Sequence, residues 1–213
     1  MTQVIVTRVK TSPRGKCKIF IGCGGEFLVS MDLVMKFGIK SGSVIDEEKF
    51  YRMLSEQEFI NVKQIAYNYA SYRPRTEREV RDKLSEKGFS PDAQEMAIEF
   101  LYEFKLLDDK KFAANFIRSY LERKPSGKKR VYVELLTKGV DKYLAKSAIE
   151  ECYPEDNTYT MCLAAAEKKY RSISHKQPDK LKEAMIRYLM MRGFAWDDIR
   201  MAINEVIPGQ KTG

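Results

Sequence analysis

Side chains that commonly perform catalysis or bind metals are sparse in this sequence. His175 is the only histidine, and the segment around it, Ser172 to Pro178, is typical of a loop, so we interpret it as an exposed loop residue. The four cysteines include no Cys-x-x-Cys pair, the usual pattern of a zinc site or a redox dithiol. We therefore predict that the chain is not an enzyme and takes no metal or other cofactor.

Two short motifs could in principle bind ions. Asp108-Asp109 could form a metal pair, but acidic residues also favour the first turn of a helix, and we prefer that interpretation. Gly22-Cys23-Gly24-Gly25 is rich in glycine but does not open a helix, so it predicts a hairpin turn rather than a phosphate-binding loop. The Gly-x-x-x-x-Gly-Lys-Ser/Thr phosphate-binding motif is absent from the sequence.

Positive charge is the main chemical feature of the sequence. Lys and Arg total 38 against 30 Asp and Glu, which gives a formal net charge of +8. This balance favours an anionic partner, either nucleic acid or an acidic protein surface. The candidate binding residues form three groups: Arg73 and Arg75; Arg118, Arg123, Lys124, Lys128, Lys129 and Arg130; and Lys168, Lys169 and Arg171.

The three groups differ in quality. Acidic residues interleave with the first group, so a salt-bridged, solvated helix face explains it as well as a binding site does. Only Glu122 interrupts the second group, and Pro125-Ser126-Gly127 predicts a loop at its centre, which favours binding. Tyr120, Tyr132 and Tyr170 lie among these charges and could stack on bases or pack half-buried in the protein.

The second group includes an unusual helix start. We expect Ser126 to cap a helix, which places Lys128, Lys129 and Arg130 in the first turn. Cations are unfavourable at that end of a helix, so stability does not explain them. We hypothesise that this helix start binds an anion.

The sequence pattern predicts neither a membrane-spanning helix nor a signal peptide. No stretch approaches the roughly 20 apolar residues of a membrane helix, and the first residues do not resemble a signal peptide. Cys17 and Cys23, placed on one predicted strand, lie too far apart for a disulfide. The sequence predicts a cytoplasmic protein with free, buried thiols and no membrane partner.

The secondary-structure pattern changes once along the chain. Before residue 46, β-branched and alternating residues predict strands over 4–9, 16–21 and 26–29, followed by a short helix from Ser30 to near Gly38. From Asp46 onward the apolar spacing is helical, and no comparable strand pattern follows.

The helical part repeats itself three times. Each unit places a leucine four residues before a glycine, and an Ala-Ile pair nine and ten residues after that glycine. The anchor residues are Leu84, Gly88 and Ala97-Ile98 in the first unit, Leu135, Gly139 and Ala148-Ile149 in the second, and Leu189, Gly193 and Ala202-Ile203 in the third. Glycine ends one helix in the left-handed conformation, and a second helix follows. A preceding helix, at about 47–71, 109–123 or 157–170, completes each unit.

We therefore predict a mainly α fold with three tandem three-helix repeats that form an elongated, curved body, and a small β-rich N-terminal segment. The expected boundaries are 1–45 for a β-hairpin or meander with a short helix, and 46–106, 107–155 and 156–213 for the repeats. One compact helical bundle with accidental internal similarity is the alternative.

The same motifs resemble a known family. The segment Tyr69-Ala70-Ser71-Tyr72-Arg73-Pro74-Arg75-Thr76-Glu77, followed by Lys87-Gly88-Phe89, Leu107-Asp108-Asp109, Lys138-Gly139-Val140 and Arg192-Gly193-Phe194, is similar to the RecX family of bacterial regulators of the RecA recombinase. The similarity covers about residues 60–206. It implies a non-enzymatic, three-repeat helical protein that lodges in the groove of the RecA filament on single-stranded DNA. Such proteins suppress ATP hydrolysis and strand exchange by blocking filament growth or promoting disassembly.

The implied partners are the RecA filament and single-stranded DNA, with non-specific double-stranded DNA as a further option, and the protein is expected to be a monomer. A stand-alone DNA-binding protein of helix-turn-helix type is the alternative function, because such proteins also use helix pairs of this size. That alternative requires one exposed recognition helix. The second helices of the units look too apolar for this role, as in Ala97-Ile98 and Leu101.

Overall fold

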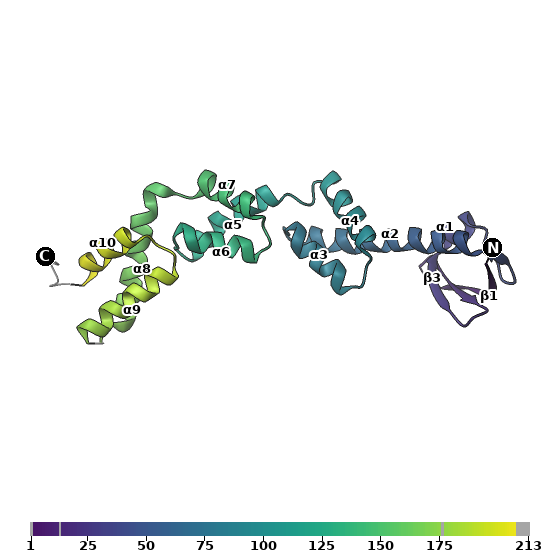
Figure 1. The fold of residues 1–213 in the computed structure, drawn as a ribbon, viewed down its shortest axis with the longest axis horizontal. Helices are drawn as coiled ribbons and strands as arrows, with labels where there is room; N and C mark the ends of the chain where they lie inside the picture. Colours follow the sequence, from purple (N-terminus) through teal and green to yellow (C-terminus); the bar gives the residue numbers. More distant parts are fainter. Residues whose placement is uncertain (1, 13, 176, 208–213) are drawn as a thin grey trace. The chain divides into compact units, whose positions relative to one another are not determined.

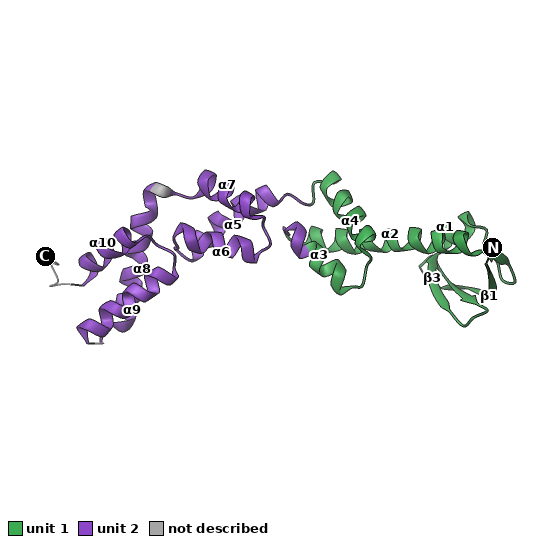
Figure 2. Ribbon diagram, in the orientation of Figure 1, with its two compact units in different colours: residues 1–73, 80–106 green, residues 74–79, 107–213 purple. Residues whose placement is uncertain are grey.

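The computed structural model describes residues 2–12, 14–175 and 177–207; residues 208–213, the end of the predicted third repeat, lie outside it. The described chain divides into two compact units (Figures 1 and 2): residues 1–73 with 80–106, and residues 74–79 with 107–213. None of the described helices combines the length and apolar character that a membrane span requires.

The first unit begins with a four-stranded antiparallel sheet. Its strands are β1 (Gln3–Ser12), β2 (Lys16–Ile21), β3 (Glu26–Ser30) and β4 (Val44–Asp46), in the order β3-β2-β1-β4. The short helix α1 (Met31–Lys36) starts at Ser30, whose hydroxyl accepts from the Leu33 N–H. One face of the sheet is buried against α1 and the start of α2, and this contact forms a core that includes Val6, Ile19, Val29, Phe50 and Met53.

Helix α2 (Glu47–Tyr72) belongs to both this core and the first helix triplet. Its N-terminal residues Phe50 and Met53 pack under the sheet, whereas Val62, Ala66 and Ala70 are buried further along. The triplet is completed by α3 (Glu77–Glu86) and α4 (Pro91–Glu103), and α4 packs on α2. Ser90 caps α4, as the Ser-Pro sequence indicates, by accepting from the Ala93 N–H.

The second unit contains two further helix triplets. The first is α5 (Asp109–Arg123), α6 (Lys128–Thr137) and α7 (Lys142–Cys152); the second is α8 (Thr158–Ile173), α9 (Pro178–Met191) and α10 (Trp196–Val206), preceded by the 3-10 turn η1 (Glu155–Asn157). Asp108 caps α5 through the Lys111 N–H at 2.8 Å, which confirms the helix-start interpretation of the Asp108-Asp109 pair.

The glycine anchors behave as the repeat predicts. Gly88, Gly139 and Gly193 have φ angles of 79°, 88° and 77°. The amide after each glycine donates to the carbonyl of the anchor leucine, at 3.3, 3.1 and 3.4 Å. Leu84, Leu135 and Leu189 are at most 1% exposed, and the three paired isoleucines are also buried. This confirms a mainly α fold with three helix triplets behind a small β-rich segment.

Three details differ from the expectations. Strand β4 was not predicted, because it is only three residues long and pairs with Gln3–Ile5 from the far end of the segment. Cys23 lies in the β2–β3 turn rather than on a strand. Of the four free cysteines, Cys17 and Cys162 are buried, whereas Cys23 and Cys152 are exposed.

Candidate nucleic-acid interface

Four of the predicted binding residues surround the connection between α5 and α6. Arg123 ends α5, Lys124 is its C-cap, and Lys128 and Lys129 begin α6. All four side chains are exposed. Because they are close in sequence on either side of a short turn, they form one local cationic surface, which we term the α5–α6 basic loop.

Two members of this loop also contact the protein itself. The Arg123 Nε–H donates to the Ser119 carbonyl at 3.0 Å, which holds its guanidinium along α5. The Lys128 ammonium lies 5.7 Å from the centre of the Tyr153 ring, within the range of a cation–π contact. Neither of these two contacts is an ion pair.

Arg130 is part of the internal packing of its repeat. Its guanidinium pairs with Glu134 one turn later on α6, and it is half-buried. Hydrogen bonding to Tyr120, and then to Glu134, raises the pKa of Arg130. The charge is therefore permanent, but it is partly balanced inside the repeat.

The start of α6 is covered by the end of α9. The Gly127 N–H donates to the Arg192 carbonyl at 2.8 Å, and a Cβ on Gly127 would overlap the Gly193 carbonyl. The expectation that Ser126 caps this helix is wrong, because the N-cap is Gly127 and it makes no side-chain bond. Ser126 is buried, and its hydroxyl donates to the Lys124 carbonyl at 2.9 Å.

The start of α3 is covered in the same way by the end of α6. The Thr76 hydroxyl donates to the Lys138 carbonyl at 2.7 Å, and a Cβ on Gly139 would overlap the Arg78 side chain. The anchor glycines of the second and third triplets therefore have a role that the sequence did not reveal. Each glycine turn packs against the beginning of the middle helix in the preceding triplet.

The predicted residues near α3 have unequal exposure. Arg73 is the exposed C-cap of α2. The Arg75 side chain is only 12% exposed and lies 3.9 Å from the Glu79 carboxylate. Of this pair, Arg73 is the better placed to meet a partner, whereas Arg75 belongs to the packed helix start.

The remaining candidates lie on α5 and α8. Arg118 is exposed and borders a cavity of about 510 Å³, which also has Glu122 and Glu151 in its lining. On α8, Lys168 is exposed, Lys169 lies 5.2 Å from the Tyr188 ring centre, and Arg171 lies 3.6 Å from Glu167.

The tyrosines near these charges serve packing. Tyr120 is 8% exposed and belongs to the core of the second triplet. Tyr132 packs partly buried against that core, and Tyr170 packs against the core of the third triplet. Of the two interpretations left open by the sequence, the structure supports packing.

Two side chains that could act as nucleophiles, Cys162 and Tyr159, have raised pKa values. Within residues 2–12, 14–175 and 177–207, no group of three His, Cys, Asp or Glu side chains is arranged to hold a metal ion. Burial raises the pKa of Cys162 to about 12, so its thiol stays protonated at neutral pH. A hydrogen bond to Glu205 raises the pKa of Tyr159 to about 12, which keeps that hydroxyl neutral as well.

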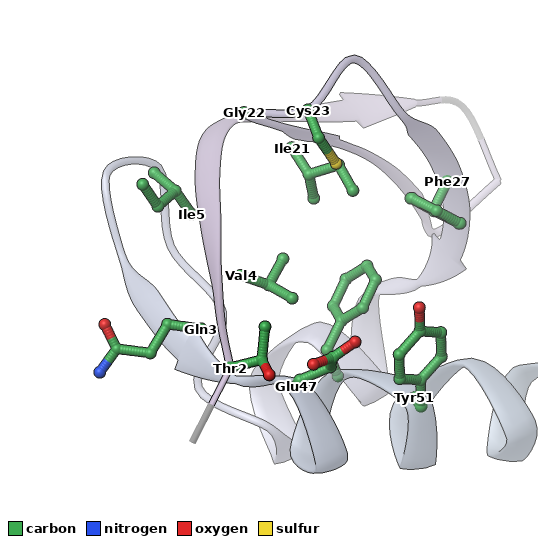
Figure 3. A pocket seen from close by; sticks show the side chains of 11 residues that line it. Thr2, Gln3, Val4, Ile5, Ile21, Gly22, Cys23, Phe27, Glu47 and Tyr51 are labelled. Atoms are coloured by element: carbon green, nitrogen blue, oxygen red, sulfur yellow. The ribbon is translucent and has the colours of Figure 1, made fainter.

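The glycine-rich turn borders a cavity of about 450 Å³ between β1, β2 and the start of α2 (Figure 3). Val4, Ile21, Phe27 and Phe50 contribute apolar surface to this cavity. Among the described residues that line it, Glu47 is the only charged one. An anionic phosphate would meet a carboxylate here. The turn therefore acts as the predicted hairpin connection between β2 and β3.

Comparison with known proteins gives the family. The RecX models for the first, second and third three-helix domains match residues 63–101, 108–149 and 155–203. This chain belongs to the RecX family. The three matched ranges follow the order of the three helix triplets and confirm the resemblance seen in the sequence motifs.

Relatives of similar length carry the same family name. A regulatory protein RecX of Clostridium perfringens (strain SM101 / Type A) is 33% identical over 196 residues, which is 90% of this chain and 91% of the relative. A second, from Clostridium tetani (strain Massachusetts / E88), is 28% identical and covers 95% and 94% of the two chains. These relatives are named as regulators rather than as enzymes.

Solved structures agree with the fold. A crystal structure of a regulatory protein RecX superposes with a TM-score of 0.69 at 19% identity, over 94% of this chain and 99% of that chain. The crystal structure of RecX from Lactobacillus salivarius gives a TM-score of 0.62 at 28% identity, over 70% and 96% of the two chains.

Proposed function

We propose that this protein binds the cytoplasmic RecA–single-stranded DNA filament and inhibits recombinase activity. It suppresses ATP hydrolysis and strand exchange by blocking filament growth or promoting disassembly. The observation that carries the proposal is the match of all three RecX three-helix domains, in order, over residues 63–203. This role needs no catalytic group in the protein itself.

The α5–α6 basic loop supports contact with an anionic filament. Its four exposed cations lie around one turn, and Lys129 has no charged partner among the described residues. Two anionic targets fit this loop: DNA phosphates and an acidic surface of the recombinase. The salt dependence of binding separates these targets, because phosphate contacts release condensed counterions.

A helix-turn-helix DNA reader is a weaker explanation. The third helix of each triplet packs against the first, as seen for α4 on α2, α7 on α5 and α10 on α8. Ala97, Ile98 and Leu101 of α4 are buried in that contact. A recognition helix needs a polar face that reaches base edges, and these buried positions reduce the face available to do so.

The direct test is RecA ATPase activity on single-stranded DNA with increasing amounts of this protein. We expect the rate to fall toward zero when the protein saturates the filament. Adding the protein to preformed filaments, and separately before nucleation, distinguishes disassembly from a block of growth. An unchanged ATPase rate under both orders of addition would overturn the proposed function.

The basic loop is tested by neutralising three of its cations in Lys124→Gln/Lys128→Gln/Lys129→Gln. We expect inhibition to require at least about tenfold more protein. If phosphates are contacted, the log–log salt slope of binding falls by about 2, from ~0.7 per phosphate on single strands. Lys40→Gln/Lys87→Gln/Lys146→Gln removes the same charge from exposed positions elsewhere. Equal inhibition by the two variants would exclude the loop from the interface.

A further inference from the structure

The outer face of the N-terminal sheet is a second cationic surface. In β1 and β2, Val9, Cys17 and Ile19 face the core, so the residues that alternate with them point to the opposite face. The β1–β2 register shifts between Val6 and Arg8, so the buried Val6 does not place Arg8 on the core face. Arg8, Lys10, Lys16 and Lys18 occupy that opposite face, and all four are exposed. We call it the sheet face. The first 46 residues carry seven Lys and Arg against three Asp and Glu.

The register arranges this face in rungs across three strands. Read from β1 through β2 to β3, the first rung is Arg8, Phe20 and Glu26. The second rung is Lys10, Lys18 and Leu28, and the third is Ser12, Lys16 and Ser30. The three rungs therefore bring four cations onto one face together with Phe20, Leu28 and the acidic Glu26. Lys16 and Lys18, two residues apart on β2, have Cα atoms roughly 7 Å apart along the strand.

Stability does not account for this arrangement. Like charges directly opposite one another in an antiparallel pair are destabilising, and Lys10 and Lys18 form such a pair. Glu26 offsets one of these charges through an ion pair with Lys18, and both side chains are about half exposed. Arg8, Lys10 and Lys16 make no ion pair with the described residues. Three adjacent cations thus remain uncompensated on an open face.

The apolar neighbours identify the class of partner. Phe20 is half-buried on β2 in the rung that also holds Arg8, and Leu28 beside Lys18 is 47% exposed. Open sheet faces that combine cations with an aromatic ring suit single-stranded nucleic acid, because bases stack on the ring while phosphates meet the cations. An acidic protein surface would use the cations but would not require the aromatic ring.

We propose that the sheet face binds single-stranded nucleic acid directly, with Arg8, Lys10 and Lys16 on the phosphates and Phe20 under a base. This contact is separate from the α5–α6 basic loop and does not depend on a recombinase. It assigns to the N-terminal sheet a binding role of its own, beyond that of an end cap for the first helix triplet.

The phosphate contacts are tested on the full chain with a fluorescent oligothymidylate and no other protein. Arg8→Gln/Lys10→Gln/Lys16→Gln should weaken binding at least about fivefold at low salt. It should also lower the log–log salt slope by about 2, at ~0.7 per phosphate. The control Lys40→Gln/Lys87→Gln/Lys146→Gln removes equal charge and should leave the slope unchanged. Equal slopes for the two triple variants would overturn the proposal.

The stacking contact is tested by a conservative pair of substitutions. Phe20→Leu keeps an apolar side chain on the sheet but removes the ring, and should weaken oligothymidylate binding about fivefold or more, with an unchanged salt slope. Phe20→Tyr keeps the ring and should bind like the parent. Circular dichroism confirms that both variants are folded. If Phe20→Leu binds normally and the triple variant loses affinity for polyglutamate as much as for DNA, an acidic protein is the partner and the proposal is wrong.

Discussion

At the scale of single residues, Asp109 shows how one repeat is tied to the next. Its carboxylate accepts from the Glu77 N–H at 3.0 Å, so a residue at the start of α5 satisfies an amide at the start of α3. Burial raises the pKa of Asp109; this N–H bond opposes that effect, and the nearby charges of Glu77, Asp108 and Glu79 add to it. The ionised carboxylate is thus held at some electrostatic cost.

The sign of the pH dependence follows from this raised pKa. The folded protein holds the Asp109 proton more tightly than the unfolded chain does, so this residue favours folding most in acid. The contribution of Asp109 to folding stability is greatest below pH about 4, which is the pKa of a free aspartate. This contribution is lost as the pH rises through the raised pKa of Asp109 in the folded protein. Asp109→Asn keeps an oxygen acceptor for the Glu77 N–H and removes this dependence. We expect the variant to gain stability relative to the parent between pH 4 and pH 7, measured by urea unfolding.

Asp141 provides a comparison of opposite sign. Hydrogen bonds from the Tyr143 and Leu144 N–H groups lower the pKa of this exposed N-cap. Its stabilising effect is therefore present above the pKa of free aspartate and is lost as the pH falls through the lowered value. Asp141→Asn should lose stability relative to the parent at pH 7, and the difference should shrink in acid. The same trend for both variants would contradict the burial argument for Asp109.

At the scale of elements, the glycine turn after each middle helix combines two functions. It ends the helix with a left-handed residue, and in the second and third triplets it also approaches the preceding triplet closely. Gly88 has the same backbone conformation, but a Cβ added to it would meet nothing within 4 Å among the described residues. Gly139 and Gly193 would place that carbon against Arg78 and against the backbone of Arg130. A substitution at Gly88 therefore tests backbone strain alone, whereas a substitution at Gly139 or Gly193 tests backbone strain together with the contact between repeats.

Alanine at each glycine should reveal this difference. Gly88→Ala incurs only the left-handed strain, about 1–2 kcal/mol. Gly193→Ala adds overlap with a backbone that cannot rotate away, and overpacking of this kind costs about 1–3 kcal/mol more. Gly139→Ala should fall between them, because a side chain is its neighbour. The measurement is the free energy of unfolding of the unit that carries each variant. A Gly193→Ala loss no larger than that of Gly88→Ala would show that the contact is not stabilising.

Elements with long local patterns were predictable, whereas those defined by distant partners were not. The expected helices at 47–71, 109–123 and 157–170 correspond to Glu47–Tyr72, Asp109–Arg123 and Thr158–Ile173, because apolar period and caps are local properties. Strand β4 depends on pairing with residues about 40 positions earlier. The covering of Gly127 by Arg192 is likewise a contact between distant segments, so the composition of the α6 start gave no indication of it.

At the scale of the whole molecule, sequence charge located the candidate surfaces only in part. Charge counting found the α5–α6 basic loop, but it could not tell that Arg75 lies mostly buried beside Glu79 or that Arg130 is balanced by Glu134. The sheet face was missed because its cations are spread over two strands. They become one surface only through the β1–β2 register, which no single segment specifies.

Two separate cationic surfaces on one chain predict additive binding to a long single strand. The sheet-face triple variant and the basic-loop triple variant each remove three charges from different units. If both surfaces contact phosphates independently, their free-energy losses add, and the combined variant should lower the log–log salt slope by about 4, at ~0.7 per phosphate. The measurement is a salt titration of polythymidylate binding by all three variants. A combined variant that binds no more weakly than the weaker triple variant would mean that the two surfaces do not act independently on the same strand.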